Sequence, residues 1–222
     1  SPNLYEIHFM LGNLLTSFED YEKSIEIYKK IPSDHYLGEY ASIQISNLYS
    51  LEDENKKAIE QLKTFLKTRE TFDVFMSLGN YFRYDSNWKQ AVEAYERAID
   101  LGTPIENQNL WDAYFKIGIV YERSENWSKA EDHFLKALEL YRDQPDVLNY
   151  LGYSYIDMNI NMNKAKEMVE KALEQKPGDP YIIDSMAWYY FKTGAYEEAR
   201  SLLEYAINLM PYDPIINDHY GD

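Results

Sequence analysis

Cysteine is absent from the 222 residues of this sequence. Its absence excludes disulfide bonds, thiolate nucleophiles and zinc–thiolate sites from the chain. It is compatible with a reducing cytosol and with an oxidising periplasm, so it leaves the cellular compartment open. Long apolar runs are absent as well. None approaches the roughly 20 residues that a membrane-spanning helix needs, so we expect no direct membrane insertion.

Lysine and arginine are scarce relative to the acidic residues. The chain has 22 of them against 38 aspartates and glutamates, which gives a net charge of −16 at pH 7. Nucleic acids bind to clustered lysines and arginines, so we expect no nucleic-acid partner. The same charge balance disfavours anionic membrane surfaces. A strongly acidic surface more often serves solubility than binding.

Patterns typical of catalytic or metal sites are also missing. The sequence has no His-Glu-x-x-His motif, no glycine-rich phosphate loop and no nucleophile elbow. Glu131, Asp132 and His133 are adjacent on a predicted helix, so their side chains point about 100° apart instead of converging on a metal. We therefore expect no enzyme activity, no metal and no cofactor within these residues. The histidines are scattered, at His8, His35, His133 and His219.

An apolar residue followed by a small one recurs along the chain, and we call the small residue the anchor of its repeat. Successive anchors are 34, 33, 39, 34, 35 and 34 residues apart, a period of about 34. Sixteen positions after each of the first six anchors (seventeen in the fifth copy) stands a large apolar residue, which we call the facing residue. The anchors are Gly12, Ser46, Gly79, Gly118, Gly152, Ala187 and Gly221, and the facing residues are Tyr28, Leu62, Tyr95, Phe134, Val169 and Leu203.

Each recurring feature has a physical reason. A small anchor allows two helices to cross closely, where a larger side chain would hold them apart. Apolar residues three and four apart form one apolar stripe per helix. Pro177 and Pro211 close the last two full copies, because proline cannot donate the next helical hydrogen bond. The pattern therefore predicts two helices per repeat.

Together these residues resemble the tetratricopeptide repeat (TPR) family, most closely from Phe72 to Pro211. The resemblance implies an all-α fold, a right-handed α-α superhelix (solenoid) of stacked helix–turn–helix repeats with twelve main helices and no sheet. We predict a single array over 1–222. Its repeats lie at about 5–38, 39–71, 72–110, 111–144, 145–179 and 180–213, followed by a partial repeat at 214–222.

Two segments depart from the regular pattern. The longest step places extra residues around Leu101–Asn109, where Gly102 and Pro104 break the helix, so we predict a long loop or hinge there. Residues 214–222 begin a seventh copy that is too short to form a stable helix alone. We expect the chain to be a fragment whose C-terminal end, with Ile215, Ile216 and Tyr220, frays or self-associates. The last two full copies also resemble bacterial multi-repeat proteins of the cell envelope.

Three asparagines occupy the position after the anchor in successive repeats, and we call Asn13, Asn47 and Asn80 the asparagine ladder. The family resemblance implies that the first helix of each pair lines a concave groove. An asparagine amide can donate to a peptide carbonyl and accept from a peptide N–H at the same time. The ladder therefore suits an extended peptide backbone. As exposed residues, the three amides are expected to contribute little to stability.

Charged and aromatic residues complete the predicted groove. Arg83, with Lys116 and Arg123 nearby, predicts a local basic spot in an acidic protein. Towards the C-terminal end the groove positions become aromatic, and aromatic side chains dominate interface energetics when they fill pockets. The alternative is that these rings only cover the seams between repeats. The aromatic groove residues are Tyr150, Tyr153, Tyr181, Trp188 and Phe191.

These features predict a non-enzymatic scaffold that binds a peptide or protein segment in its concave groove. One alternative is a structural segment of a longer superhelix. Another is a regulatory region of an enzyme whose catalytic domain is absent from this chain. The ladder favours the first interpretation, whereas the incomplete seventh copy favours the second.

Overall fold

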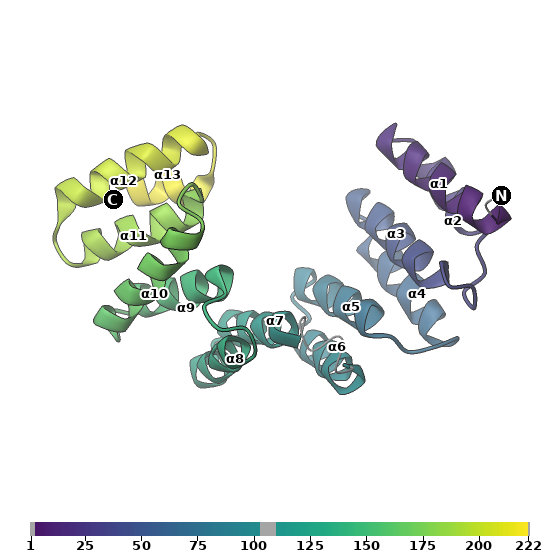
Figure 1. Cartoon of the computed structure of the whole chain (residues 1–222), viewed down its shortest axis with the longest axis horizontal. Helices are drawn as coiled ribbons and strands as arrows, with labels where there is room; N and C mark the ends of the chain where they lie inside the picture. Colours follow the sequence, from purple (N-terminus) through teal and green to yellow (C-terminus); the bar gives the residue numbers. More distant parts are fainter. Residues whose placement is uncertain (1–2, 103–109, 222) are drawn as a thin grey trace. The chain divides into compact units, whose positions relative to one another are not determined.

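A computed structural model describes residues 3–102 and 110–221 of the chain. Within these two stretches there are thirteen helices and no strand (Figure 1). The all-α prediction is confirmed for the described residues. No helix in the described stretches is both long and apolar enough to cross a membrane.

The helices are short, with the bounds typical of hairpin repeats. They are α1 (Leu4–Ser17), α2 (Tyr21–Tyr28), α3 (Gly38–Leu51), α4 (Asn55–Leu66), α5 (Phe72–Tyr84), α6 (Trp88–Leu101), α7 (Leu110–Arg123), α8 (Trp127–Leu140), α9 (Pro145–Asp157), α10 (Met162–Gln175), α11 (Pro180–Lys192), α12 (Tyr196–Leu209) and α13 (Pro214–Gly221). Helices α1 to α6 and α9 to α12 form consecutive packed pairs, and the eight-residue α13 follows α12. The pairs follow the order of the predicted repeats, whose boundaries stay a prediction.

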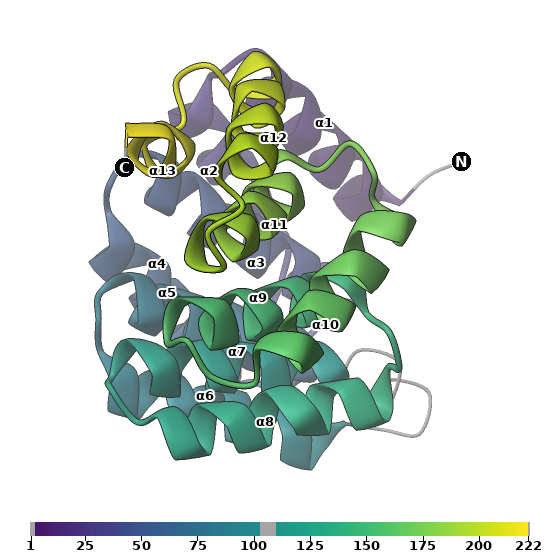
Figure 2. The ribbon, with the colours of Figure 1, turned by 90° about the vertical axis from the view of Figure 1, so that its left-hand side faces the viewer.

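The chain forms two compact units, which we call the N-terminal unit (1–130) and the C-terminal unit (131–222). In the N-terminal unit each second helix packs on its own first helix and on the next one, so α2 contacts α1 and α3, and α4 contacts α3 and α5. In the C-terminal unit α12 contacts α11 and α13 in the same way. Figure 2 shows these three helices lying together near the C-terminus.

The crossing of α1 with α2, and of α5 with α6, depends on a glycine anchor opposite a tyrosine. A Cβ added at Gly12 would lie 2.5 Å from the nearest ring atom of Tyr28, and one added at Gly79 would lie closer still to Tyr95. Such approaches leave no room for any side chain larger than hydrogen. Where the anchor is Ser46, the facing residue is the smaller Leu62. A small anchor thus lies at a close helix crossing in these repeats, as the repeat pattern predicted.

The fifth turn has two residues with a left-handed backbone, Asn161 being the extra one, and every turn inside a pair has one seven positions after the anchor. In five of the six turns this residue is not glycine, so the turn retains backbone strain. A left-handed residue after a helix lets the chain reverse and begin the second helix within a few residues. The six residues are Glu19, Asp53, Ser86, Glu125, Asn159 and Gly194.

The predicted long loop begins where α6 ends. Gly102 caps α6 with an extended backbone (ψ 120°), so the helix stops at the predicted place. Residues 103–109, which make up most of that loop, lie outside the described residues.

The segment after the sixth pair forms α13, which is held by contacts with other helices. The Asp213 carboxylate accepts the backbone N–H groups of Ile215 and Ile216 at 3.0 and 3.1 Å, which caps the helix. Ile216 is fully buried in a cluster with Ile183 and Ala206. These contacts supply the stability that an isolated eight-residue helix lacks. Ile215 remains exposed, so self-association through this end stays a prediction.

Candidate functional site

Each amide oxygen of the asparagine ladder accepts a hydrogen bond from a tyrosine hydroxyl. One of the two lone pairs of each amide oxygen is therefore used within the protein, and binding of a peptide by these amides stays a prediction. Removing an amide would deprive a mostly buried hydroxyl of its acceptor, so the ladder contributes to stability as well. The three pairs are Asn13–Tyr28 at 2.6 Å, Asn47–Tyr81 at 2.8 Å and Asn80–Tyr95 at 2.8 Å.

Two of these tyrosines are also the facing residues of their repeats. The ring of Tyr95 packs on Gly79, and its hydroxyl reaches the amide of Asn80, the next residue along α5. The same arrangement joins Tyr28 to Gly12 and Asn13. One side chain therefore fixes the helix crossing and the direction of a ladder amide together.

The second repeat obtains its tyrosine from a different place. Its facing residue, Leu62, has no hydroxyl, but Tyr81 on α5 extends to Asn47 on α3. Tyr81 stands two positions after its own anchor, where the first and second repeats have Leu14 and Leu48. Each of the three ladder amides thus accepts from a tyrosine hydroxyl, although in the second repeat the tyrosine comes from the following repeat.

Burial keeps these hydroxyls protonated. It raises the pKa of Tyr81 to about 12. Burial also raises the pKa of Tyr95, an effect that the nearby Arg83 guanidinium partly offsets. The pKa of Tyr28 is raised by burial too, and the hydroxyls of Thr16 and Ser24 oppose the shift. The three phenols are therefore O–H donors throughout the physiological pH range.

The predicted basic spot is largely neutralised by neighbouring carboxylates. Lys116 forms an ion pair with Asp112, one turn earlier on α7, at 2.5 Å. The guanidinium of Arg123, which is well exposed, lies 3.4 Å from the Glu122 carboxylate. Both cations thus have acidic partners on their own helix.

Arg83 differs from these two cations. Its guanidinium lies 4.8 Å from the centre of the Tyr84 ring. Its buried Nε has no hydrogen-bond partner among the described residues. Arg83 stands one helical turn after Asn80 on α5, so it lies beside the ladder.

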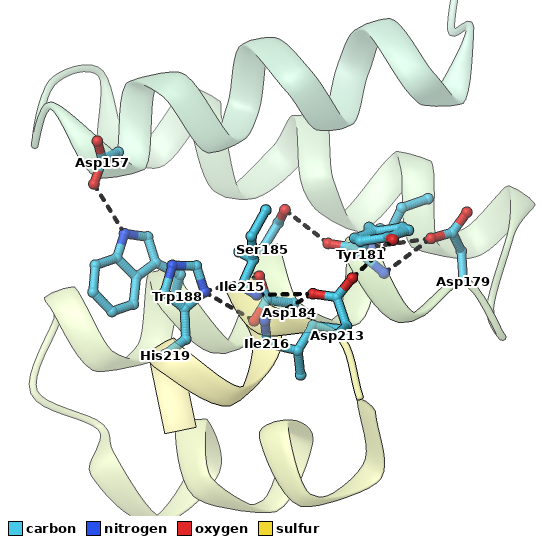
Figure 3. A network of polar contacts seen from close by, with 11 residues as sticks. Asp157, Asp179, Tyr181, Asp184, Ser185, Trp188, Asp213, Ile215, Ile216 and His219 are labelled. Carbon is cyan, nitrogen blue, oxygen red and sulfur yellow. Dashed lines mark hydrogen bonds and ion pairs between the residues drawn. The ribbon is translucent and has the colours of Figure 1, made fainter. Parts of the chain in front are cut away.

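In the C-terminal unit, the predicted aromatic anchor Trp188 is buried. Only 7% of its surface is exposed. Its ring stacks on His219 of α13 at 4.3 Å (Figure 3) and on Phe191 at 4.9 Å. Its indole N–H donates to the Asp157 carboxylate at 3.3 Å. The ring of Trp188 therefore offers a partner little surface while α13 is in place.

The other predicted aromatic residues have contacts of the same kind. Tyr150 packs against Phe134 with ring centres 5.3 Å apart, and Tyr153 lies 6.1 Å from His219. Tyr181 is the most exposed, and its hydroxyl donates to Asp213 at 3.0 Å. These rings have contacts within the protein, and binding of a partner by them stays a prediction.

The sequence analysis missed one buried polar pair. The His219 Nδ1 lies 2.9 Å from both carboxylate oxygens of Asp184, and both residues are buried (Figure 3). The pair joins α13 to α11. Its spacing of 35 residues, close to one repeat period, was the available signal. No group of three or more His, Asp or Glu suited to a metal occurs in the described parts of the chain.

Comparison with known sequences matches residues 70–143 and residues 5–31 to models described as tetratricopeptide repeat. The TPR repeat-containing protein PA4667 of Pseudomonas aeruginosa is 34% identical over 80 residues. That segment is 36% of this chain and 13% of the length of PA4667, so the chain spans only a small part of this relative.

Solved structures of similar fold cover nearly the whole chain. PilW, described as a widely conserved type IV pilus biogenesis factor, is similar with a TM-score of 0.77 at 16% identity, over 98% of this chain and 99% of PilW. YrrB, described as a TPR protein with an unusual peptide-binding site, has a TM-score of 0.57 at 21% identity, over 91% of this chain and 98% of YrrB. At these identities the similarity shows the fold alone.

Proposed function

Because this chain belongs to the tetratricopeptide repeat family, whose members generally act as scaffolds for protein–protein interactions, we propose that it binds a peptide segment along the asparagine ladder. The observation that carries this proposal is the ladder itself. Three successive first helices of the N-terminal unit present an amide at the same repeat position, and a tyrosine holds each amide in a defined orientation.

The repeat fold does not itself require an asparagine at the ladder position. In the fourth, fifth and sixth repeats the same position is Ile119, Tyr153 and Trp188, and their facing residues lack a hydroxyl. A repeat can therefore form without the asparagine–tyrosine pair. A fixed row of polar groups on one side of successive helices is what an extended backbone requires for binding.

A second candidate function, assembly into a larger structure, is favoured by the outer face of α1. Ile7, Leu11 and Leu14 are exposed on this helix, whereas the same repeat positions in α3 are Ala41, Ile45 and Leu48, all buried. Exposed apolar residues three and four apart are typical of a face that packs on another helix. Light scattering on the chain and on a Leu11→Ser, Leu14→Ser variant tests this: loss of association in the variant supports it, and an unchanged monomer contradicts it.

Peptide selection followed by affinity measurement tests the ladder proposal. Peptides selected from a displayed library against the chain should bind at least about tenfold more weakly when all three ladder residues are changed to alanine, since each hydrogen bond contributes about 0.5–1.5 kcal/mol. The matched control is Asn87→Ala, an exposed asparagine in a turn of the same unit. Circular dichroism should establish that each variant is folded. Equal affinity in the ladder variant would refute the proposal.

A further inference from the structure

In the second to fifth repeats, a lysine lies over the aromatic ring that stands three positions after the anchor. The ammonium groups lie 5.0–5.6 Å from the ring centres, which is within the range of a cation–π interaction. The face of this ring is therefore a recurring site for an ammonium group. The pairs are Lys29 and Lys57 with Tyr49, Lys63 with Phe82, Lys129 with Tyr121, and Lys164 with Tyr155.

These lysines come from two repeat positions. One is five residues before the facing residue of the same repeat, as at Lys57, and the other directly follows the facing residue of the preceding repeat, as at Lys63. For the sixth repeat the residues at these positions are Glu198 and Glu170. The sixth ring, Tyr190, therefore keeps its repeat position, but no lysine or arginine of the described residues lies over it.

Tyr190 borders a hollow of about 570 Å³ between α10, α11 and α12, all in the C-terminal unit. The acidic residues of its lining are exposed, whereas the apolar ones are buried or half-buried. A hollow with an apolar floor and carboxylates near solvent suits a side chain with an apolar stem and a cationic head. The apolar lining residues are Leu173, Met186 and Leu202, and the acidic ones are Glu170, Glu197 and Glu198.

Two of the three carboxylates have no counter-charge. Glu197 and Glu198 have no hydrogen bond or ion pair with any residue that the structure describes. Glu170 is paired with Lys166 at 3.5 Å, and this carboxylate raises the pKa of Lys166. The same ammonium lies 5.8 Å from the centre of the Tyr189 ring and only interacts electrostatically with the hydroxyl of the sixth ring. The lysine therefore does not replace the missing cation.

We propose that this hollow binds a lysine side chain from a basic segment of another protein. The ammonium lies over the Tyr190 ring, where the other repeats have a lysine of their own, and Glu197 and Glu198 supply the counter-charge. The methylene stem packs on the apolar floor. The net charge of −16 attracts a basic segment as well. This surface belongs to the C-terminal unit, whereas the asparagine ladder belongs to the N-terminal unit, so the proposal goes beyond the proposed function.

A metal ion fits the hollow less well than an ammonium group. Glu197 and Glu198 are adjacent on α12, so their side chains point about 100° apart instead of converging. No group of three or more His, Asp or Glu that could hold a metal occurs in the described ranges. An ammonium group needs no fixed coordination geometry, and the tyrosine ring contributes to its binding.

Two pentapeptides that differ only in the ammonium group test the proposal. Both are acetylated and amidated; one is Gly-Leu-Lys-Leu-Gly, and the other has norleucine in place of lysine. Titration into the chain labelled with ¹³C at the methionine methyl groups, followed by NMR, should shift the Met186 signal and leave that of Met76, in the N-terminal unit, unchanged. We expect the norleucine peptide to bind at least about fivefold more weakly. Equal binding, or no shift of Met186 at millimolar lysine peptide, would overturn the proposal.

The decisive variant supplies the missing lysine from within the chain. Glu198→Lys places a lysine where the second, fourth and fifth repeats have one over their ring, so it should occupy the hollow. We expect it to weaken binding of the lysine peptide by at least about fivefold. The charge-matched control is Glu139→Lys, an exposed residue of α8 in the same unit, which should weaken binding by less than about twofold at physiological salt. An equal loss in both variants would show a response to net charge alone and contradict a specific site.

A pair of tyrosine variants isolates the ring face. Tyr190→Phe retains the ring and should bind the lysine peptide within about twofold of the wild type, whereas Tyr190→Leu should bind about fivefold more weakly. Circular dichroism should establish that both variants are folded. Equal binding by the two would show that the ring contributes nothing, against the proposal. Light scattering tests the other occupant: a dimer that Glu198→Lys disrupts would mean that the hollow holds a lysine of a second copy, and a separate partner would be ruled out.

Discussion

The contact between Gly79 and Tyr95 makes a single added methyl group costly. The Cβ of an alanine at Gly79 would lie 2.6 Å from Cδ1 and 2.8 Å from Cζ of the tyrosine ring. Carbon atoms in contact normally lie about 3.5–4.0 Å apart, so the ring must move by about 1 Å. The ring is completely buried, and its hydroxyl is bonded to Asn80. Overpacking costs about 1–3 kcal/mol and loss of the hydrogen bond about 0.5–1.5 kcal/mol, so Gly79→Ala should destabilise by about 2–4 kcal/mol.

Urea unfolding at pH 7, followed by circular dichroism, measures this effect. The control is Gly178→Ala, because an added Cβ there has no neighbour within 4 Å. It should leave the unfolding midpoint almost unchanged or raise it slightly, since alanine restricts the unfolded chain. The second repeat has a serine anchor facing Leu62, and the sixth has an alanine anchor facing Leu203. The double variant Gly79→Ala, Tyr95→Leu should therefore recover part of the lost stability.

Two results would refute this reasoning. If Gly79→Ala unfolds at the same urea concentration as Gly178→Ala, the close crossing is not a constraint on the fold. If Tyr95→Leu destabilises the Gly79→Ala protein as much as it destabilises the wild type, the two positions are not coupled. In that case the pairing of small anchors with tyrosines would have another cause.

Three further predictions follow from single contacts. Glu125 adopts a left-handed backbone, so Glu125→Gly should stabilise by about 1 kcal/mol in urea unfolding; a lower midpoint would contradict the strain. His219→Ala should cost about 2 kcal/mol and shift Trp188 fluorescence to longer wavelength; an unshifted spectrum would show that α13 does not cover the ring. Burial raises the pKa of the Asp146 carboxyl, but its hydrogen bonds, one of them from Lys176, lower the pKa by more. The folded pKa of Asp146 is therefore below its ordinary value. The stability difference between the wild type and Lys176→Gln should therefore be fully present above about pH 3.9 and disappear as pH falls through the lower folded pKa; persistence below that range would contradict it.

The fold could be predicted because its determinants are local and periodic. The small anchor, the facing residue and the apolar stripe recur in each copy, so counting along the chain finds the two helices of every repeat. The left-handed turns were not predicted, because five of the six residues at that position are not glycine. In these turns the short connection between packed helices overrides the backbone preference of the residue.

The candidate site was only partly predictable, for a related reason. The ladder positions follow from the repeat period, whereas the bond from Tyr81 to Asn47 joins two repeats and has no periodic signal. The ion pair between Lys116 and Asp112 was visible in the sequence, since residues four apart on a helix are neighbours. The burial of Trp188 depends on α13, which the sequence analysis treated as an unstable end.

If the ladder binds a peptide as proposed, the hydrogen bond from Tyr81 to Asn47 couples the second and third repeats in that binding. Asn47 belongs to the second repeat, but the hydroxyl that orients it belongs to the third. In a repeat array each unit is stabilised mainly by its neighbours, and units at the ends open first. Local opening of the third repeat would release the amide of the second, and the affinity there would fall before any residue in contact with ligand had unfolded. Conversely, a ligand bound at Asn47 stabilises the seam between α3 and α5, so its binding should slow hydrogen exchange of backbone amides in α5.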